Sequence, residues 1–138
     1  MIIFVLLFLT ALLWGTSPIL EKIGLRNTAP FIALTIRSLS VSVALLIALT
    51  CMGKIKDIFS VDGKTMTLFI VSGIMAGLLG MWAYFGALKA GATSKIVPIA
   101  ASYPLITALL SVIILKEAVT PLRLIGTLLI IAGIWLVK

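Results

Sequence analysis

The residues that could do chemistry in this 138-residue chain are a few charged side chains set in or beside long apolar runs. Glu21 and Lys22 end the first run, Arg37 lies inside the second, and Glu117 follows the fourth. Charged groups at membrane depth are costly unless they face protein or a wet cavity. The absence of histidine and the single cysteine, Cys51, argue against an intrachain disulfide, a metal centre and histidine acid–base chemistry. We predict no catalytic residue, metal or cofactor, and regard these charges as candidates for binding or gating.

The composition is that of a protein surrounded by lipid. The chain is 62% hydrophobic and 11% charged, with a mean hydropathy of +1.33. A soluble domain has about 45–50% apolar and about 25% charged residues. The net charge of +7 comes from Lys and Arg residues spread singly between apolar runs, whereas a nucleic-acid site needs them clustered. The sequence therefore predicts a lipid bilayer as partner and no nucleic acid.

Five apolar runs reach or approach the roughly 20 residues that a membrane-spanning helix needs. The first is predicted to be a retained helix, because no basic segment precedes it as in a signal peptide. We predict an all-α integral membrane protein, multi-pass and in the cell (inner) membrane, with one domain over residues 1–138. The predicted helices cover residues 2–20, 31–52, 65–88, 95–115 and 122–137.

The basic residues of the loops are balanced between the two sides of the membrane. With five spans, one side holds five of them and the other side holds five, and Arg37 belongs to neither. An excess of Lys and Arg on one side normally fixes orientation, so the balance favours insertion both ways round. The alternative is a chance balance, with orientation fixed by the first helix. The two sets are Lys54, Lys56, Lys64, Lys116 and Arg123, and Lys22, Arg26, Lys89, Lys95 and Lys138.

Helical spacing places polar residues of the first run on one face. Trp14, Ser17 and Glu21 follow one another at three or four residues, and lipid would reject most of such a stripe. We expect this face to line a cavity. Two other readings stay open: Trp14 can belong to an interfacial aromatic belt, and Glu21 with Lys22 can be an ordinary helix end in contact with headgroups.

The remaining charges also have two readings each. Arg37 lies about 9 Å inside its helix, where it can face a polar cavity or extend to the interface. Glu117 can form a local ion pair beside its helix end, or act as a latch by pairing with Lys22 or Arg37.

Small residues and prolines mark the packing faces and bends. Gly73, Gly77 and Gly80 share a face with Tyr84, which predicts close helix contact there, with Tyr84 either in a central space or in ordinary packing. Pro18 and Pro104 remove backbone donors and are candidate hinges, although each can be a static kink. The bend at Pro104 would bring Thr107 to a binding wall. A second pair, Gly126 and Gly133, is predicted to pack in the last helix.

Taken in order, these residues resemble the EamA family of the drug/metabolite transporter superfamily. The similarity covers nearly the whole chain, and each motif alone is weak. The matching positions are Trp14-Gly15 with Lys22, then Arg37, Ala87-Leu88-Lys89, Tyr103-Pro104, Leu115-Lys116-Glu117, Gly126 and Gly133. The chain departs from the family pattern at Thr16-Ser17-Pro18, and at Lys116, where the family often has glycine.

The resemblance implies half of a ten-helix transporter. Family members typically carry two such units with inverted halves, so this chain would form a homodimer, probably an antiparallel one, around a cavity lined by helices one to four. Family substrates include amino acids, metabolites and lipophilic drugs, which leaves the solute open.

We therefore expect a secondary transporter or exporter of small metabolites, amino acids or lipophilic and cationic compounds, working by alternating access. One alternative is a structural or assembly subunit of a larger membrane complex. Another is a small multidrug exporter, although such proteins carry a carboxylate deep in their first helix and Glu21 lies at its end. The predicted solute contacts are Trp14, Arg37, Tyr84, Tyr103 and Thr107, and the predicted gating charges are Glu21, Lys22 and Glu117.

Overall fold

The computed structural model describes residues 1–118 and 120–137, without the side chain of Arg123. Lys138, one of the cations in the predicted balance, lies outside the described residues. Every regular element in the described ranges is a helix. The chain divides into two compact units, residues 1–89 and 90–138.

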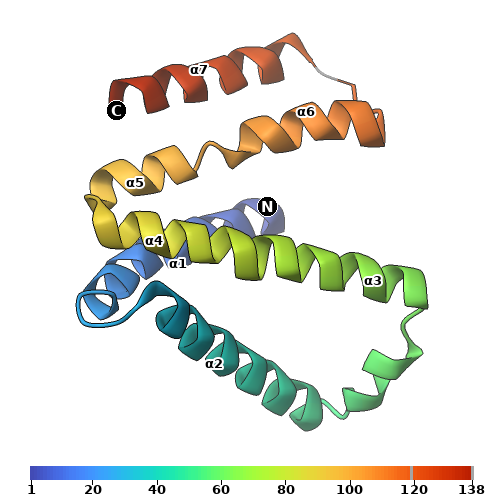
Figure 1. Ribbon diagram of the computed structural model, residues 1–138. Helices are drawn as coiled ribbons and strands as arrows, with labels where there is room; N and C mark the ends of the chain where they lie inside the picture. Colours follow the sequence, from blue (N-terminus) through green and yellow to red (C-terminus); the bar gives the residue numbers. More distant parts are fainter. Residues whose placement is uncertain (119, 138) are drawn as a thin grey trace. The chain divides into compact units, whose positions relative to one another are not determined.

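The first unit is built from long helices whose ends are set by local chemistry (Figure 1). Pro30 occupies the first turn of its helix, where its missing N–H costs nothing. Gly53, at φ 69°, follows the end of that helix. Asp62 caps the next one by accepting a hydrogen bond from the Thr65 N–H at 2.9 Å. The elements are α1 (Ile2–Gly24), α2 (Pro30–Cys51), the 3₁₀ helix η1 (Ile55–Ser60), α3 (Gly63–Ser72), the π-helix η2 (Gly73–Gly80) and α4 (Met81–Ala90).

The helices of the first unit meet at one corner. The C-terminal ends of α1 and α4 and the N-terminal end of α2 lie close together, while α2 and α3 diverge towards their other ends (Figure 1). The buried residues of the described chain all belong to this unit: Pro18, Leu25, Leu34, Phe85 and Leu88. Most other apolar side chains are exposed, as expected for helices that contact lipid.

A π-helical segment widens the third span in its middle. Elements α3, η2 and α4 form one continuous helical stretch, and its glycines Gly73, Gly77 and Gly80 all lie in η2. A Cβ atom added at Gly73 or Gly77 would meet no atom within 4 Å, and one at Gly80 would lie 3.3 Å from the Met75 carbonyl oxygen. Within the first unit no side chain or neighbouring helix therefore packs closely against Gly73 and Gly77, and their packing role stays a prediction.

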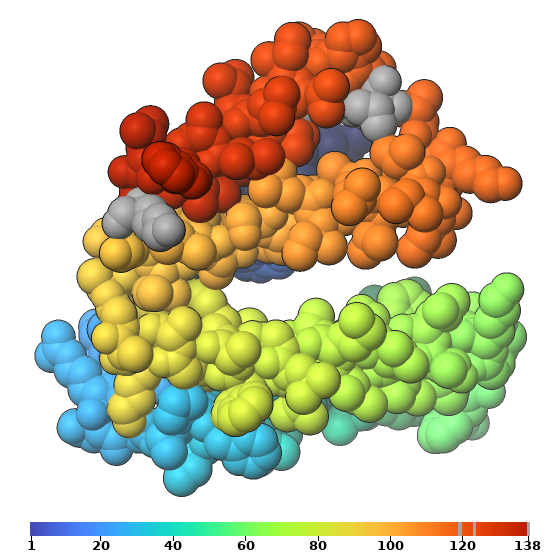
Figure 2. Space-filling view, turned by 45° about the horizontal axis from the view of Figure 1, so that its top comes forward, coloured from blue at the N-terminus to red at the C-terminus, as the bar shows by residue number. Residues whose placement is uncertain are grey.

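In the second unit the predicted helix 95–115 is divided. It forms α5 (Thr93–Ala100), which contains Pro98, and α6 (Tyr103–Leu115). Pro104 stands in the first turn of α6, not in a helix interior, because its nitrogen has no hydrogen to donate to the backbone bond that would continue α5. Helix α7 (Pro121–Val137) runs antiparallel to α6 and beside it (Figures 1 and 2).

Among the described residues, four helical stretches are long and apolar enough to cross a membrane, namely residues 2–24, 30–51, 63–90 and 93–115. The fifth predicted span corresponds to α7, which has 17 residues. At 1.5 Å per residue it measures about 25 Å, slightly less than the about 30 Å of a bilayer core. These stretches support a multi-pass membrane protein, while a fifth crossing stays a prediction.

Candidate functional site

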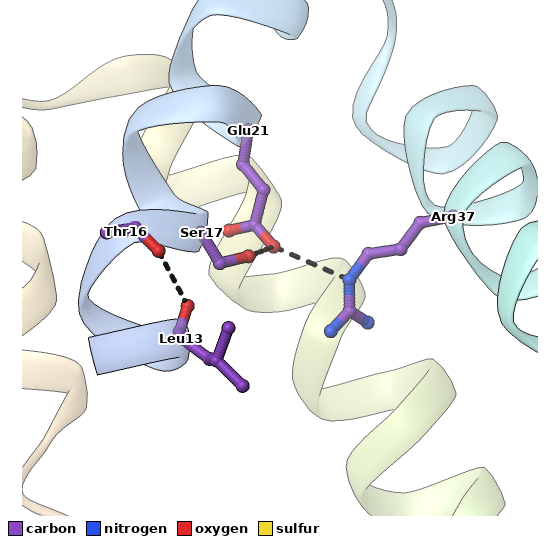
Figure 3. A network of polar contacts seen from close by, with 5 residues as sticks. All are labelled: Leu13, Thr16, Ser17, Glu21 and Arg37. Carbon is purple, nitrogen blue, oxygen red and sulfur yellow. Dashed lines mark hydrogen bonds and ion pairs between the residues drawn. The ribbon is translucent and has the colours of Figure 1, made fainter. Parts of the chain in front are cut away.

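A carboxylate and a guanidinium from neighbouring helices meet in the first unit (Figure 3). Glu21 Oε1 lies 3.4 Å from Arg37 Nε and accepts a hydrogen bond from the Ser17 hydroxyl at 3.0 Å. The Glu21 side chain is 11% exposed and that of Arg37 is 44% exposed. The pair therefore joins a nearly buried anion to a cation that still reaches open space.

The local sequence explains how these groups come together. Helix α1 continues through Pro18 to Gly24. The predicted helix end at Leu20 is therefore too early, and Glu21 lies inside the helix. Ser17 precedes Glu21 by four residues, which places both on one helical face. The Ser17–Glu21 hydrogen bond shows that these two members of the predicted polar stripe point the same way. Thr16 is separate from this network, because its hydroxyl bonds the Leu12 and Leu13 carbonyls of its own helix (Figure 3).

The ion pair lines an open cavity of about 360 Å³. The contacts between the three polar residues run through Glu21 Oε1, Arg37 Nε and the Ser17 hydroxyl. Mostly apolar walls with a few convergent polar groups are typical of small-molecule sites. Such a cavity can hold a solute that combines an apolar body with a charged group. Its lining residues are Ser17, Leu20, Glu21, Gly24, Thr28, Ala33, Ile36, Arg37 and Phe85.

Lys22 lies beside this pair in sequence but faces α4. Its ammonium donates to the carbonyl oxygens of Leu88 at 2.6 Å and Lys89 at 3.2 Å. Lys89 in turn donates to the Thr28 carbonyl at 2.8 Å. The predicted gating cation thus contacts backbone carbonyls at the end of a helix, an arrangement that no sequence spacing indicated.

The predicted aromatic contacts lie outside the lining of this cavity. Trp14 is 66% exposed. Tyr84 is half-buried, with its ring centroid 6.1 Å from that of Phe85. The wall residue that the sequence analysis missed is Phe85, the neighbour of the chosen tyrosine. No feature of the sequence distinguishes it from other apolar residues of its helix, and only the meeting of α1, α2 and α4 selects it.

In the second unit, Glu117 lines a separate cavity of about 270 Å³ between α6 and α7, together with Ser111 and Thr127. Tyr103 and Thr107 lie outside its lining, and the Thr107 hydroxyl bonds the Tyr103 carbonyl of its own helix at 3.3 Å.

The glycines of α7, like Gly73 and Gly77 of η2, have empty space where a side chain would begin. A Cβ atom added at Gly126 or Gly133 would meet nothing within 4 Å among the described residues. Their packing role, like that of Gly73 and Gly77, stays a prediction.

Comparison with known proteins gives one family. The sequence matches the EamA-like transporter family over residues 1–138. It is 32% identical over 130 residues to an uncharacterised protein of Methanocaldococcus jannaschii, in an alignment that covers 94% of this chain and 91% of that protein. No solved structure matches the sequence.

Proposed function

Because this chain belongs to the EamA-like transporter family, we propose that it transports a small charged or amphipathic metabolite through a site built on Glu21 and Arg37. The observation that carries this proposal is the ion pair itself. It lies inside two membrane-length helices and opens onto a cavity of about 360 Å³. Charged side chains within membrane-spanning helices are rare and mark binding or transport sites by default.

The chemistry of the pair suits reversible binding. A carboxylate group of a solute can bind the terminal nitrogens of the Arg37 guanidinium in bidentate geometry. A cationic group can instead bind the Glu21 carboxylate. The Glu21–Arg37 contact is long at 3.4 Å, so exchanging it for a solute costs less than breaking a short, fully buried pair would.

The proposed working form is an antiparallel homodimer in the inner membrane. Its support is the exposed apolar surface, the open glycine faces of η2 and α7, and the equal division of loop cations. Each chain would be one transmembrane domain, with α7 as the fifth crossing, and two inverted copies would make a ten-helix transporter. Alternating access would then move Trp14, Tyr84, Tyr103 and Thr107 towards or away from the solute path. In this cycle Glu117 would act as a gating charge, and Pro18 and Pro104 as bending points.

Transport by the purified protein tests this function. Proteoliposomes are loaded with a panel of amino acids and organic cations, and exchange of labelled solute is measured. At least one solute should exchange, and Arg37→Gln should lower the rate about tenfold or more, because a charge-assisted contact is worth at least that factor. Lys56→Gln, which removes a loop cation, is the matched control and should keep the rate.

Sealed vesicles that move none of the panel, or an Arg37→Gln variant as active as the wild type, would contradict the proposal. Co-purification with one other membrane protein, without a homodimer, would favour the assembly-subunit alternative.

Labelling of cysteines tests the two orientations. In a Cys51→Ser background, Arg26→Cys and Lys56→Cys place one thiol at each end of α2. An impermeant maleimide applied to intact cells should label about half of each variant if the chain inserts both ways. Complete labelling of one site and none of the other would establish a single orientation and reject the antiparallel dimer.

A further inference from the structure

Two lysines form hydrogen bonds across the corner of the first unit. One extends from α1 to the end of α4, and the other extends from α4 back to the turn between α1 and α2. Lys22, near the end of α1, donates to the carbonyl oxygens of Leu88 and Lys89 in the last turn of α4. Lys89 donates back to the carbonyl oxygen of Thr28, in the turn between α1 and α2. We call these contacts the lysine clamp.

The clamp has a clear physical basis. The last carbonyls of a helix lack intrahelical partners, and the C-terminal end of a helix carries partial negative charge that favours a cation. Helix α4 ends at Ala90, so Leu88 and Lys89 offer such carbonyls. Lys22 is half-buried, which shields its contacts from water. The Thr28 carbonyl lies in a turn and is satisfied by the returning Lys89.

The contacts enclose the residues that shape the cavity. Leu25, Leu34 and Leu88 are at most 2% exposed and form the buried cluster of the corner. Phe85, one turn before Leu88, belongs to the same cluster and also lines the cavity. Thr28, which accepts from Lys89, is another lining residue. A displacement of the α4 end relative to the α1–α2 turn would therefore move two walls of the cavity.

We propose that Lys22 and Lys89 are positioning residues: they hold the end of α4 against the α1–α2 turn and so fix Phe85 and Thr28 around the Glu21–Arg37 pair. Their ammonium groups hold backbone carbonyls and do not bind solute. The corner is then the rigid part of the unit, and movement belongs to the diverging ends of α2 and α3. The link to solute binding rests on the proposed function, whereas the clamp itself does not.

Distance measurements test the clamp without any solute. Spin labels are placed at Arg26→Cys and Ala90→Cys in a Cys51→Ser background, in nanodiscs and diluted with unlabelled protein to suppress distances between chains. The unsubstituted clamp should give one narrow distance distribution. Lys22→Met and Lys89→Met remove the ammonium groups but keep most of the apolar stem, and each should broaden the distribution about twofold by releasing the helix end.

Two further variants make the result decisive. Lys22→Arg keeps a cationic donor and should retain the narrow distribution, while Lys56→Met, a loop lysine, is the matched control. Lys89 is exposed, so Lys89→Met serves as the test even if Lys22→Met does not fold. A distribution that stays narrow in Lys89→Met, or in the double variant, would overturn the clamp.

Transport supplies the second readout. If the panel yields a solute, Lys89→Met should raise KM about tenfold with a smaller change in maximal rate, because the walls are displaced while the charges remain. An unchanged KM would reject the positioning role. If the wild type transports nothing, the proposed function fails, and the distance measurement still decides whether the clamp exists.

Discussion

The two units of this chain are organised in different ways. In the first, side chains distant in sequence meet: Lys22 reaches Leu88 across 66 positions, and Glu21 contacts Arg37 from another helix. In the second unit, the defining features are positions where proline or a left-handed residue interrupts the helical backbone. Pro98 lies within α5, Pro104 stands in the first turn of α6, and Lys116 adopts a left-handed conformation at the end of α6.

The difference shows how a small membrane protein can obtain order without a large apolar core. Lipid tails are as apolar as leucine, so burial of apolar surface drives helix association weakly in a bilayer. The first unit compensates with hydrogen bonds, an ion pair and one small buried cluster. The second unit has no buried residue among those described and depends on where proline and left-handed backbone interrupt its helices.

The largest expected contrast concerns packing. Leu88 is fully buried and Leu115 is 67% exposed. Leu88→Ala should lower the free energy of unfolding by about 2–4 kcal/mol, because it leaves a cavity. Leu115→Ala should change it by less than about 0.5 kcal/mol. Denaturation of the detergent-solubilised variants, followed by circular dichroism, measures both. Equal losses would mean that the corner is not the stability centre of the chain.

Substitutions in the Glu21–Arg37 ion pair should change the free energy of unfolding by less, and the effect of one substitution should depend on whether the other residue is present. Arg37→Gln leaves a nearly buried Glu21 carboxylate with Ser17 as its remaining partner in the described structure. The combined Glu21→Gln and Arg37→Gln variant should be more stable than Arg37→Gln alone, with a coupling energy of about 1 kcal/mol. A double-mutant cycle measures this coupling. Additive losses would show that the two groups do not interact energetically.

Substitution of the left-handed residue of the second unit, Lys116, should stabilise the protein, whereas the substitutions above destabilise it. Lys116 has φ 54°, a conformation that glycine adopts without the cost borne by other residues. Lys116→Gly should raise the free energy of unfolding by about 1 kcal/mol. Ala44→Gly, inside α2, is the control and should lower it by about 1 kcal/mol. If Lys116→Gly also destabilises the protein, the left-handed turn is absent in the membrane.

The smallest expected effect is at the cap of α3. The Thr65 N–H holds the pKa of Asp62 below its ordinary value of 3.8. Because this pKa is lower in the folded state than in the unfolded state, the carboxylate stabilises the fold at pH values above the unfolded-state pKa. This contribution is lost as pH falls through the folded-state pKa. Asp62→Ala should lower Tm at pH 6, and the two Tm values should converge as pH falls well below the ordinary pKa of 3.8. Asp62→Ser keeps a capping oxygen and should show little pH dependence. A constant Tm difference across this range would exclude the cap.

Several features of this chain follow directly from the sequence. Composition and the length of the apolar runs determine helices in lipid, because each backbone group in a bilayer must be bonded within its own segment. The i, i+4 spacing of Ser17 and Glu21 places them together. The ordered motifs from Trp14 to Gly133 identify the family, which the match over the whole chain confirms.

The tertiary structure decided which of the candidate residues meet. The sequence named no partner for Glu21, and the crossing of α1 and α2 brings Arg37 to it. The sequence proposed Lys22 as a gating charge, and the crossing of α1 and α4 places its ammonium on the Leu88 carbonyl. Phe85 becomes a cavity wall in place of its neighbour Tyr84. A helical sequence fixes which side chains share a face, because the period is local, whereas the partner of that face depends on how separate helices cross.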